Sequence, residues 1–194
     1  MVKKIGLYFG SFNPIHNGHI AFGNFFIENT DLHEVMFIVC PLNPFKTNEE
    51  LLGQQHRLNM VQQALLKFPK LICSDVEFTL PKPNYTIETL NHLISCQANV
   101  SFSLLIGEDN LVNFNKWKEY KNILKLVDLY VYPRKHRNKI PNHLLKHSKI
   151  HLLDAPKLDF TSSDIRKKLK KGEVIKSSIP TSTMAYLEKN NIYK

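Results

Sequence analysis

Short apolar runs alternate with amphipathic stretches along nearly the whole chain. The runs are rich in branched and aromatic residues, which is typical of buried strands; they lie at residues 5–9, 35–40, 71–78, 100–106, 129–132 and 150–153. Apolar residues at helical spacing predict helices at residues 18–28, 54–68, 86–95, 162–171 and 181–190, with two short helices around Trp117 within residues 111–126. Strands that alternate with helices predict an α/β fold: a Rossmann-like, doubly wound, mostly parallel sheet with helices on both faces.

The ends of the predicted helices carry recognisable signals. Thr86 is expected to be the N-cap of one helix, and the run from Thr161 to Asp164 offers hydroxyls and a first-turn acid to another. Gly172 is expected to end that second helix, and Pro180 stands just before the last one.

Three of the predicted loops follow strands and should share one edge of the sheet. These loops cover residues 10–19, 41–50 and 107–117. Ligands of such sheets bind at the carboxyl ends of the strands, so we expect the functional site there. At 194 residues the chain reads as a single domain, 1–194, without repeats, linkers or low-complexity tracts. The basic stretch 134–149 is expected to be a mobile excursion.

Composition narrows the class of protein. No apolar run approaches the roughly 20 residues of a membrane helix, and the run after Lys4 ends too early for a signal peptide. We therefore expect a cytoplasmic protein that does not bind membranes. Cys40, Cys73 and Cys96 lack metal-ligand or CxxC spacing, which predicts reduced thiols in or near the core.

The net charge of +9 raises the question of nucleic-acid binding. Much of the excess lies at residues 134–149 and 166–171, without the interleaved aromatic residues of a single-strand binding platform. Small anionic substrates and a lysine-rich surface account for the charge equally well, so no nucleic-acid partner is expected. A basic RNA-binding module on a vestigial nucleotide fold remains the alternative from another class.

The strongest chemical signal lies between the first strand and the first helix. There the sequence from Gly10 runs Gly-Ser-Phe-Asn-Pro-Ile-His-Asn-Gly-His, so His16 and His19 flank a glycine at a helix start. Both imidazoles can reach one ligand, where free backbone N–H groups and the helix dipole already favour an anion. Two unrelated surface histidines are the alternative; the preceding strand, the glycine-bearing turn and Pro14 favour a phosphate site.

A second helix start has similar potential. Ser162 and Ser163 offer hydroxyls and free N–H groups, and Arg166 adds a guanidinium one turn later. Taken alone, this segment reads as an ordinary capped helix. Together, two such starts suit a triphosphate that is held at both ends.

Two further positions could contact a flat ligand. Trp117 stands among Lys116, Lys118 and Glu119, which favours a partly exposed ring over a core residue. A helix start at Tyr85 and Thr86 is either a simple cap or a set of free N–H groups that could hold a carboxylate.

These segments together resemble the bacterial nicotinate mononucleotide adenylyltransferases of the HxGH nucleotidyltransferase superfamily. The matching segments span the chain: residues 6–19, 57–60, 85–89, 106–109, 114–117, 161–166, 179–180, 186–188 and 192–193. The outer motifs belong to the whole superfamily, whereas residues 85–89 and 106–117 point to the nicotinate branch. The resemblance implies the reaction of ATP with nicotinate mononucleotide to give deamido-NAD and pyrophosphate, in NAD biosynthesis.

The resemblance and the chemistry of the side chains give each candidate residue an expected role. The catalytic group is expected to be His16, His19, Lys46 and Arg166. ATP is expected to contact Gly10, Ser11, Phe12, His16, His19, Gly107, Asp109, Ser162, Ser163 and Arg166. Nicotinate mononucleotide is expected to contact Asn13, Lys46, Tyr85, Thr86, Trp117 and Arg134. Mg²⁺ should arrive with ATP, without metal ligands from the chain, and a homo-oligomer is compatible with the sequence.

The chain departs from the family pattern at three places. Phe9 stands where the family often has a first glycine, and Asn13 replaces an acidic residue before proline. The loop 43–46 reads Asn-Pro-Phe-Lys where Pro-Pro-His-Lys is common, so a third imidazole is missing while Lys46 remains. A pantetheine-phosphate adenylyltransferase shares the outer motifs and is the alternative within the superfamily, although such enzymes are usually shorter and need no aromatic platform.

Overall fold

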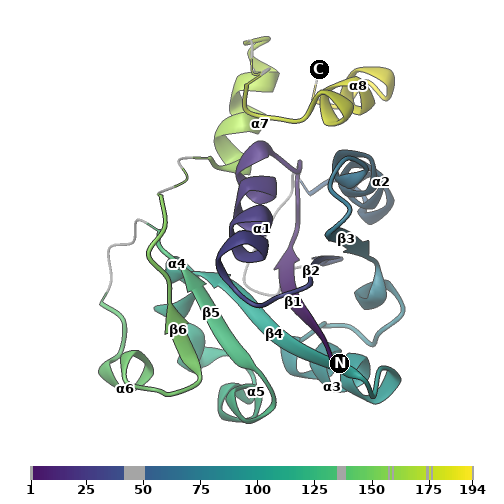
Figure 1. Cartoon of the computed structure of the whole chain (residues 1–194). Coiled ribbons are helices and arrows are strands. Elements are labelled where there is room, and N and C mark those ends of the chain that lie inside the picture. The colour runs from purple at the N-terminus through teal and green to yellow at the C-terminus, as the bar shows by residue number, and fades with distance from the viewer. Residues whose placement is uncertain are drawn as a thin grey trace.

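Parallel strands form one sheet in the computed structural model, in the order β3-β2-β1-β4-β5-β6 (Figure 1). Their bounds are β1 (Lys3–Gly10), β2 (Glu34–Val39), β3 (Leu71–Ser74), β4 (Val100–Gly107), β5 (Asp128–Tyr132) and β6 (Ile150–Leu152). The structure describes residues 2–41, 51–134, 139–156, 158, 160–173, 175 and 177–193. The strand order reverses between β1 and β4, which opens a crevice at their carboxyl ends. The predicted doubly wound α/β fold is confirmed, and every strand pair in the described residues is parallel.

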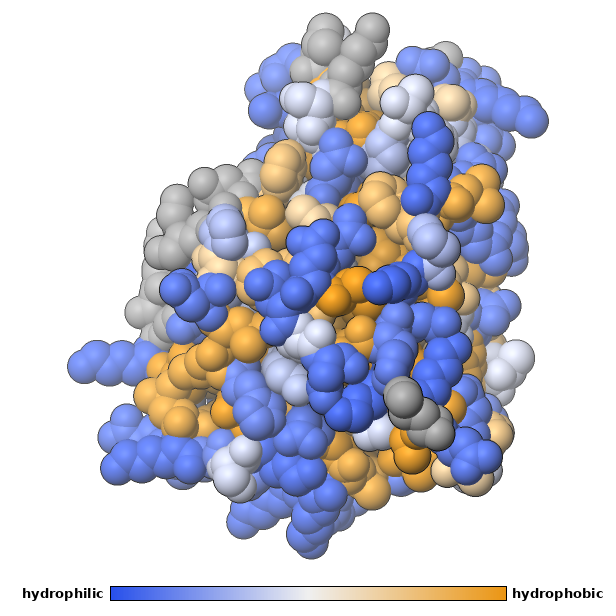
Figure 2. Space-filling view, in the orientation of Figure 1, coloured by the Kyte–Doolittle hydropathy of each residue, from blue (hydrophilic) through white to orange (hydrophobic). Residues whose placement is uncertain are grey.

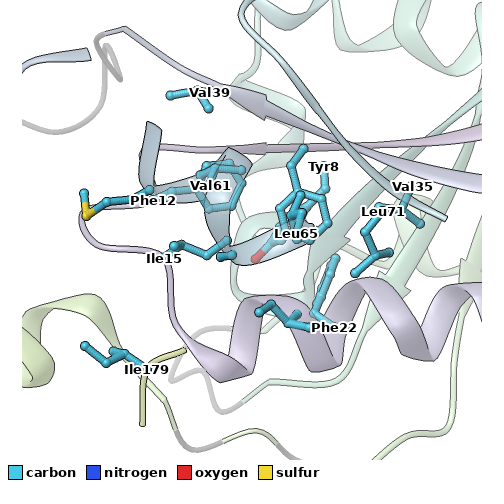
Figure 3. Close-up of a cluster of buried hydrophobic side chains, with 14 of the residues drawn as sticks. Tyr8, Phe12, Ile15, Phe22, Val35, Val39, Val61, Leu65, Leu71 and Ile179 are labelled. Atoms are coloured by element: carbon cyan, nitrogen blue, oxygen red, sulfur yellow. The ribbon is translucent and has the colours of Figure 1, made fainter. Parts of the chain in front are cut away.

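Helices cover both faces of this sheet. Helices α1 (Asn17–Asn29), α2 (Gln54–Leu65), α7 (Ser162–Lys170) and α8 (Thr181–Lys189) pack on one face, and α3 (Thr86–Cys96), α5 (Tyr120–Leu126) and the short α6 (Asn142–Leu145) on the other. The short elements α4 (Glu108–Leu111) and η2 (Phe114–Lys116) complete the second side, whereas η1 (Val76–Phe78) contributes Val76 to the α3-side core and Phe78 to the α1-side core. Each face of the sheet has its own hydrophobic core, and alternate residues of β2 point into one or the other. Phe37 packs with the α1 layer and Met36 with the α3 layer. Figure 3 shows that Phe12 and Ile15, from the loop after β1, lie in the α1-side core.

The predicted ends of α7 are confirmed. The Thr161 hydroxyl accepts a hydrogen bond from the Asp164 N–H at 3.1 Å, so Thr161 is the N-cap. Gly172 ends the helix with a φ of 69°, a conformation that glycine adopts without strain. By contrast, Thr86 is not the N-cap of α3: it is the first helical residue, and Tyr85 is the cap. The error is one residue, and the first N–H groups of α3 still lack carbonyl partners within the helix.

One predicted strand was too long. The strand expected over 71–78 ends at Ser74, and residues Val76–Phe78 form a 3-10 turn. The Ser74 hydroxyl accepts a hydrogen bond from the Val76 N–H at 3.2 Å, a local bond that competes with the strand ladder. This turn buries Glu77, which an extended strand at the sheet edge would have placed elsewhere.

The basic stretch 134–149 is more integrated than predicted. Residues 135–138 lie outside the described residues, but Asn142–Leu145 form α6 and Leu144 is fully buried in the α3-side core. The expectation of a mobile excursion is therefore wrong for α6. The cysteine prediction also needs a correction: Cys40 and Cys73 are partly buried, whereas Cys96 is exposed at the end of α3.

The surface is mixed in character. Figure 2 shows hydrophilic side chains over much of the visible face, with hydrophobic side chains between them. Across the described ranges, none of the helices combines the length and the apolar character that crossing a membrane requires.

Candidate active site

A cavity of about 410 Å³ opens at the carboxyl edge of the sheet, where β1 and β4 diverge. Its walls come from the ends of β1, β2 and β4, the start of α3, and the segment from α4 to α5. Six residues that the sequence singled out line it: Gly10, Tyr85, Thr86, Gly107, Asp109 and Trp117. The structure thus brings together, at the switch point of the sheet, segments that lie a hundred residues apart.

The two histidines of the first motif lie face to face at the start of α1. Their ring centroids are 3.5 Å apart and the planes are inclined by 20°. The backbone N–H of His16 donates to Nδ1 of His19 at 3.2 Å, so the ring hydrogen of His19 lies on Nε2. A Cβ added at Gly18 would lie 2.8 Å from Cβ of Phe160 and 3.1 Å from Nδ1 of His16. The glycine between the histidines therefore leaves the space that this pairing needs.

His16 is almost completely buried, with 1% of its surface exposed. Burial, assisted by the positive charge of Arg134, lowers its pKa to about 3. The ring is therefore neutral at pH 7 in the free protein. Its Nδ1 is buried without a hydrogen-bond partner among the described residues, which marks it as a group with unused hydrogen-bonding capacity. His16 can serve a phosphate as a neutral donor and need not carry a charge.

The starts of α1 and α7 lie side by side, as Figure 1 shows at the upper end of α1. Arg166 Nη1 donates to the backbone carbonyl of Asn13 at 3.0 Å, and the Ser162 hydroxyl donates to the carbonyl of Pro14 at 3.1 Å. Arg166 Nη2 also lies 3.5 Å from the Ser163 hydroxyl. The two anion-ready helix starts predicted from the sequence therefore belong to one site.

The part of the cavity wall formed by the start of α3 and the segment from α4 to α5 carries an aromatic ring and a helix start. Trp117 is partly exposed and packs against Phe114, with ring centroids 5.2 Å apart. Thr86 lies at the open N-terminus of α3, and the Lys118 ammonium lies 4.3 Å from the centre of the Tyr85 ring. This end can hold a flat ring together with an anionic group.

Asp109 and Arg134 form an ion pair, with 3.7 Å between Nη1 and Oδ2. Gly107 leaves room for both, because an added Cβ would lie 2.3 Å from Asp109 Oδ1 and 2.9 Å from Arg134 Cδ. Arg134 thus pairs with Asp109 and lies near enough to His16 to affect the pKa of that ring. Its expected contact with the mononucleotide stays a prediction.

The remaining expected site residues lie either in the loop before α1 or outside the described residues. Ser11, Phe12 and Asn13 lie in the loop between β1 and α1, where Phe12 and Asn13 are buried. Lys46 and Phe45 lie outside the described residues, so their expected roles stay predictions.

Sequence patterns did not predict that two charged residues would be buried beside the site. Glu77 lines the cavity with 3% of its surface exposed, and Arg57 is fully buried at the start of α2. A signal for Arg57 was available, because it lies four residues before Val61 on the apolar face of the predicted helix. Glu77 gave no such signal, since its burial depends on the turn that replaces the predicted strand.

Glu77 should make the stability of the protein depend on pH. Its Oε1 accepts a hydrogen bond from the Thr89 hydroxyl at 2.9 Å, and the Cys40 thiol is also a partner. Burial raises the pKa of this carboxyl above its usual range. The folded state therefore holds the proton more tightly, and the stability gained from it is lost as pH rises through the folded pKa. Glu77→Gln should consequently gain in melting temperature relative to wild type between pH 5 and pH 8.

The measurement is a pair of thermal melts at each pH. The exposed Glu28 provides the matched control, because Glu28→Gln should shift the melting temperature equally at both pH values. A difference between Glu77→Gln and wild type that stays constant with pH would contradict a raised pKa at Glu77.

The strand order, the switch-point cavity and the paired helix starts define a nucleotide-binding α/β protein. A model of the cytidylyltransferase-like family matches residues 7–168. The chain is 44% identical to a Flavobacterium psychrophilum protein named "Probable nicotinate-nucleotide adenylyltransferase", over 98% of this chain and 99% of that protein. A Cytophaga hutchinsonii protein of the same name is 46% identical over 89% of each chain.

A solved structure extends the likeness to three dimensions. The nicotinic acid mononucleotide adenylyltransferase of Plasmodium falciparum, complexed with NaAD, superposes with a TM-score of 0.80 at 26% identity and covers 98% of this chain and 97% of its own. The chain belongs to the cytidylyltransferase-like family and, within it, to the nicotinate-nucleotide adenylyltransferases.

Proposed function

We propose that this protein transfers the adenylyl group of ATP to nicotinate mononucleotide, releasing pyrophosphate and forming deamido-NAD for NAD biosynthesis. The observation that carries this assignment is the meeting of the starts of α1 and α7, which the Arg166–Asn13 hydrogen bond joins. The loop that leads to α1 begins at Gly10, and Gly10 lines the cavity that also holds Trp117 and the start of α3. The family relatives named for this activity support it over the full length of the chain.

The reaction needs positioning more than acid–base chemistry. An oxygen of the mononucleotide phosphate attacks the α-phosphorus of ATP in line, and a new P–O bond forms. The bond to the bridging oxygen of the β-phosphate breaks, and pyrophosphate leaves with the electron pair. The attacking phosphate is largely ionised at pH 7, so no strong general base is required. Catalysis then rests on alignment and on hydrogen bonds to the charge that spreads over the α-phosphoryl oxygens.

The phosphate-binding roles follow from this geometry. The His16 and His19 rings would donate to the transferring phosphoryl group and the ATP phosphates, His19 through Nε2. Ser163 and Arg166 would hold the departing pyrophosphate at the start of α7. Lys46 would neutralise charge between the two substrates, and the loop of Gly10, Ser11 and Phe12 would offer backbone N–H groups.

The cavity would divide between the two nucleosides. Gly107 and Asp109, at the end of β4, would face the adenosine, with Asp109 accepting from ribose hydroxyls. Trp117 would stack on the nicotinate ring, and the N–H groups near Thr86 would bind its carboxylate. Asn13, Tyr85 and Arg134 would complete the mononucleotide side.

We expect Mg²⁺ to enter as a complex with the ATP phosphates. Among the described residues, no group of three His, Cys, Asp or Glu side chains is arranged to hold a metal ion. Mg²⁺ prefers oxygen ligands and keeps several waters, so the ATP phosphates and water would supply most of its coordination. When bound, Mg²⁺ neutralises charge on the leaving pyrophosphate.

Pyrophosphate release tests the proposed function. The purified protein is given Mg-ATP with nicotinate mononucleotide, nicotinamide mononucleotide or pantetheine phosphate. Release with nicotinate mononucleotide alone, or far faster than with the others, supports the proposal. Release only with pantetheine phosphate would move the protein to that branch, and no release with any acceptor would contradict adenylyl transfer.

Arg166→Lys should raise the KM for ATP and slow turnover. A guanidinium binds two phosphate oxygens through a planar fork, which a lysine ammonium cannot reproduce. The fold should survive, because Arg166 is partly exposed. Lys167→Met, at the exposed neighbouring position of α7, is the matched control and should leave the ATP dependence unchanged. An unaltered KM for ATP in Arg166→Lys would place Arg166 outside the phosphate site.

A further inference from the structure

Arg57 is a buried cation whose position the chemistry above does not explain. None of its surface is exposed, and it lies in the first turn of α2. Its Nε donates to the carbonyl of Leu52 at 2.9 Å, and its Nη2 donates to the carbonyl of Pro41 at 2.9 Å. Its Nη1 donates to the carbonyls of Ser11 and Cys40, both at 2.7 Å. All three guanidinium nitrogens thus donate to backbone oxygens, through four hydrogen bonds in total.

The charge of Arg57 is balanced by these carbonyl dipoles. Among the described residues, no ion pair includes it. Burial lowers the pKa of the Arg57 guanidinium from its usual value, yet a guanidinium stays charged at any physiological pH. Desolvating a charge is costly, and an apolar side chain would fill the same space without that cost. The contribution of Arg57 to the structure is therefore its set of N–H donors, which hold backbone carbonyls in fixed directions.

Those four carbonyls come from both loops that follow β1 and β2. Ser11 belongs to the loop between β1 and α1, whereas Cys40 and Pro41 come directly after β2. Leu52 lies just before α2, and its N–H donates to Oδ1 of Asn13 at 3.3 Å as a second link. One side chain therefore joins the loop after β1 to the residues directly after β2 and to the residue just before α2.

The peptide between Ser11 and Phe12 is held in an unfavourable conformation. Phe12 has a φ of 44°, in the left-handed region that non-glycine residues rarely adopt. Its ring is anchored in the core, 5.5 Å from the rings of Tyr8 and Phe37 (Figure 3). In a trans peptide the C=O and the following N–H point in opposite directions. Because Arg57 holds the Ser11 carbonyl, the Phe12 N–H points away from Arg57.

We propose that Arg57 is a positioning residue for adenylyl transfer. It fixes the Ser11–Phe12 peptide so that the Phe12 N–H is presented to the substrate phosphates, and it holds Cys40 and Pro41, directly after β2, against that peptide. This inference rests on the proposed function, in which the loop after β1 binds phosphate. Arg57 itself touches no substrate.

Variants at Arg57 should lose turnover beyond any loss of stability. Arg57→Lys keeps a charge but places its donors on one nitrogen, which cannot reach three separate segments. Arg57→Met removes the donors and retains the bulk. Both should lower kcat per folded molecule by about 10- to 100-fold, the effect of misplacing phosphate-binding groups, and should raise the KM for ATP.

The matched control lies on the same helix. Leu65 is buried in the α1-side core and lies eight residues after Arg57, about two helical turns further along α2, so Leu65→Ala loses packing and leaves the hydrogen bonds of Arg57 in place. Per folded molecule, measured by circular dichroism below the melting transition, Leu65→Ala should keep the wild-type kcat and KM. Wild-type values in Arg57→Lys, or equal losses in Leu65→Ala, would assign Arg57 to stability alone.

If the variants do not fold, a measurement on the wild-type protein tests whether Arg57 positions the Phe12 N–H. In ¹⁵N-labelled protein titrated with inorganic pyrophosphate and with Mg-ATP, the Phe12 amide and the Arg57 Nε–H should shift with one dissociation constant. A Phe12 shift without an Arg57 shift, or no shift of either, overturns the proposal. This titration needs no turnover, so it stays separate from the pyrophosphate-release assay that tests the proposed function.

Discussion

His16→Ala and His19→Ala should each lower kcat by about 100-fold or more, the loss expected for one preorganised transition-state donor. The two rings are stacked at the start of α1 with their centroids 3.5 Å apart, so one phosphate group could contact both imidazoles. His16 is neutral because its pKa lies near 3, so its contribution is a hydrogen bond and not a full charge. Turnover is measured by pyrophosphate release at saturating Mg-ATP and nicotinate mononucleotide.

The pH dependence provides a second test of the same assignment. With a pKa of about 3, His16 does not change charge between pH 7 and pH 8.5, so the free enzyme should show no ionisation of His16 in kcat/KM over that range.

His92→Ala, an exposed position on α3, is the control for the two alanine variants and should retain wild-type turnover. Near-normal kcat in both active-site variants would remove the histidines from the mechanism.

The enzyme should prefer nicotinate mononucleotide over nicotinamide mononucleotide by at least about 100-fold in kcat/KM. The carboxylate of the acid can accept from the N–H groups at the start of α3, near Thr86. The amide presents an NH₂ group there, and donors that face donors leave buried polar groups unpaired. The check is kcat/KM for both acceptors at fixed Mg-ATP. Equal values, or a preference for the amide, would show that this helix start does not distinguish the carboxylate from the carboxamide on the pyridine ring.

Trp117→Ala separates ring stacking from recognition of the carboxylate. Stacking of the cationic pyridine ring on Trp117 is worth about 0.5–2 kcal/mol and is the same for both acceptors. The variant should therefore weaken both acceptors together and leave their ratio unchanged. Phe78 is a partly buried aromatic residue of η1 that does not line the cavity, and Phe78→Leu serves as the control for loss of aromatic packing.

Much of this protein could be predicted from local patterns. The buried strands around Leu7 and Leu104 were visible as apolar runs, because strands covered on both faces need apolar residues at nearly every position. The start of α7 at Thr161 and its stop at Gly172 were also visible, because caps depend on hydrogen bonds and dihedral angles within a few residues. Errors arose where local signals compete, as where the Ser74 hydroxyl turns the chain out of β3.

The sequence by itself determined the alternating α/β fold and the residue types of the candidate phosphate site, since both follow from periodicity and short-range spacing. Only the tertiary structure decided how distant groups meet. Arg166 reaches Asn13 across 153 positions of the chain, and Arg57 reaches Ser11 across 46. Such contacts depend on how helices pack over the sheet, which no window of sequence encodes. Burial is also a property of the packed fold, and it is the largest cause of the lowered pKa of His16 and of the raised pKa of Glu77.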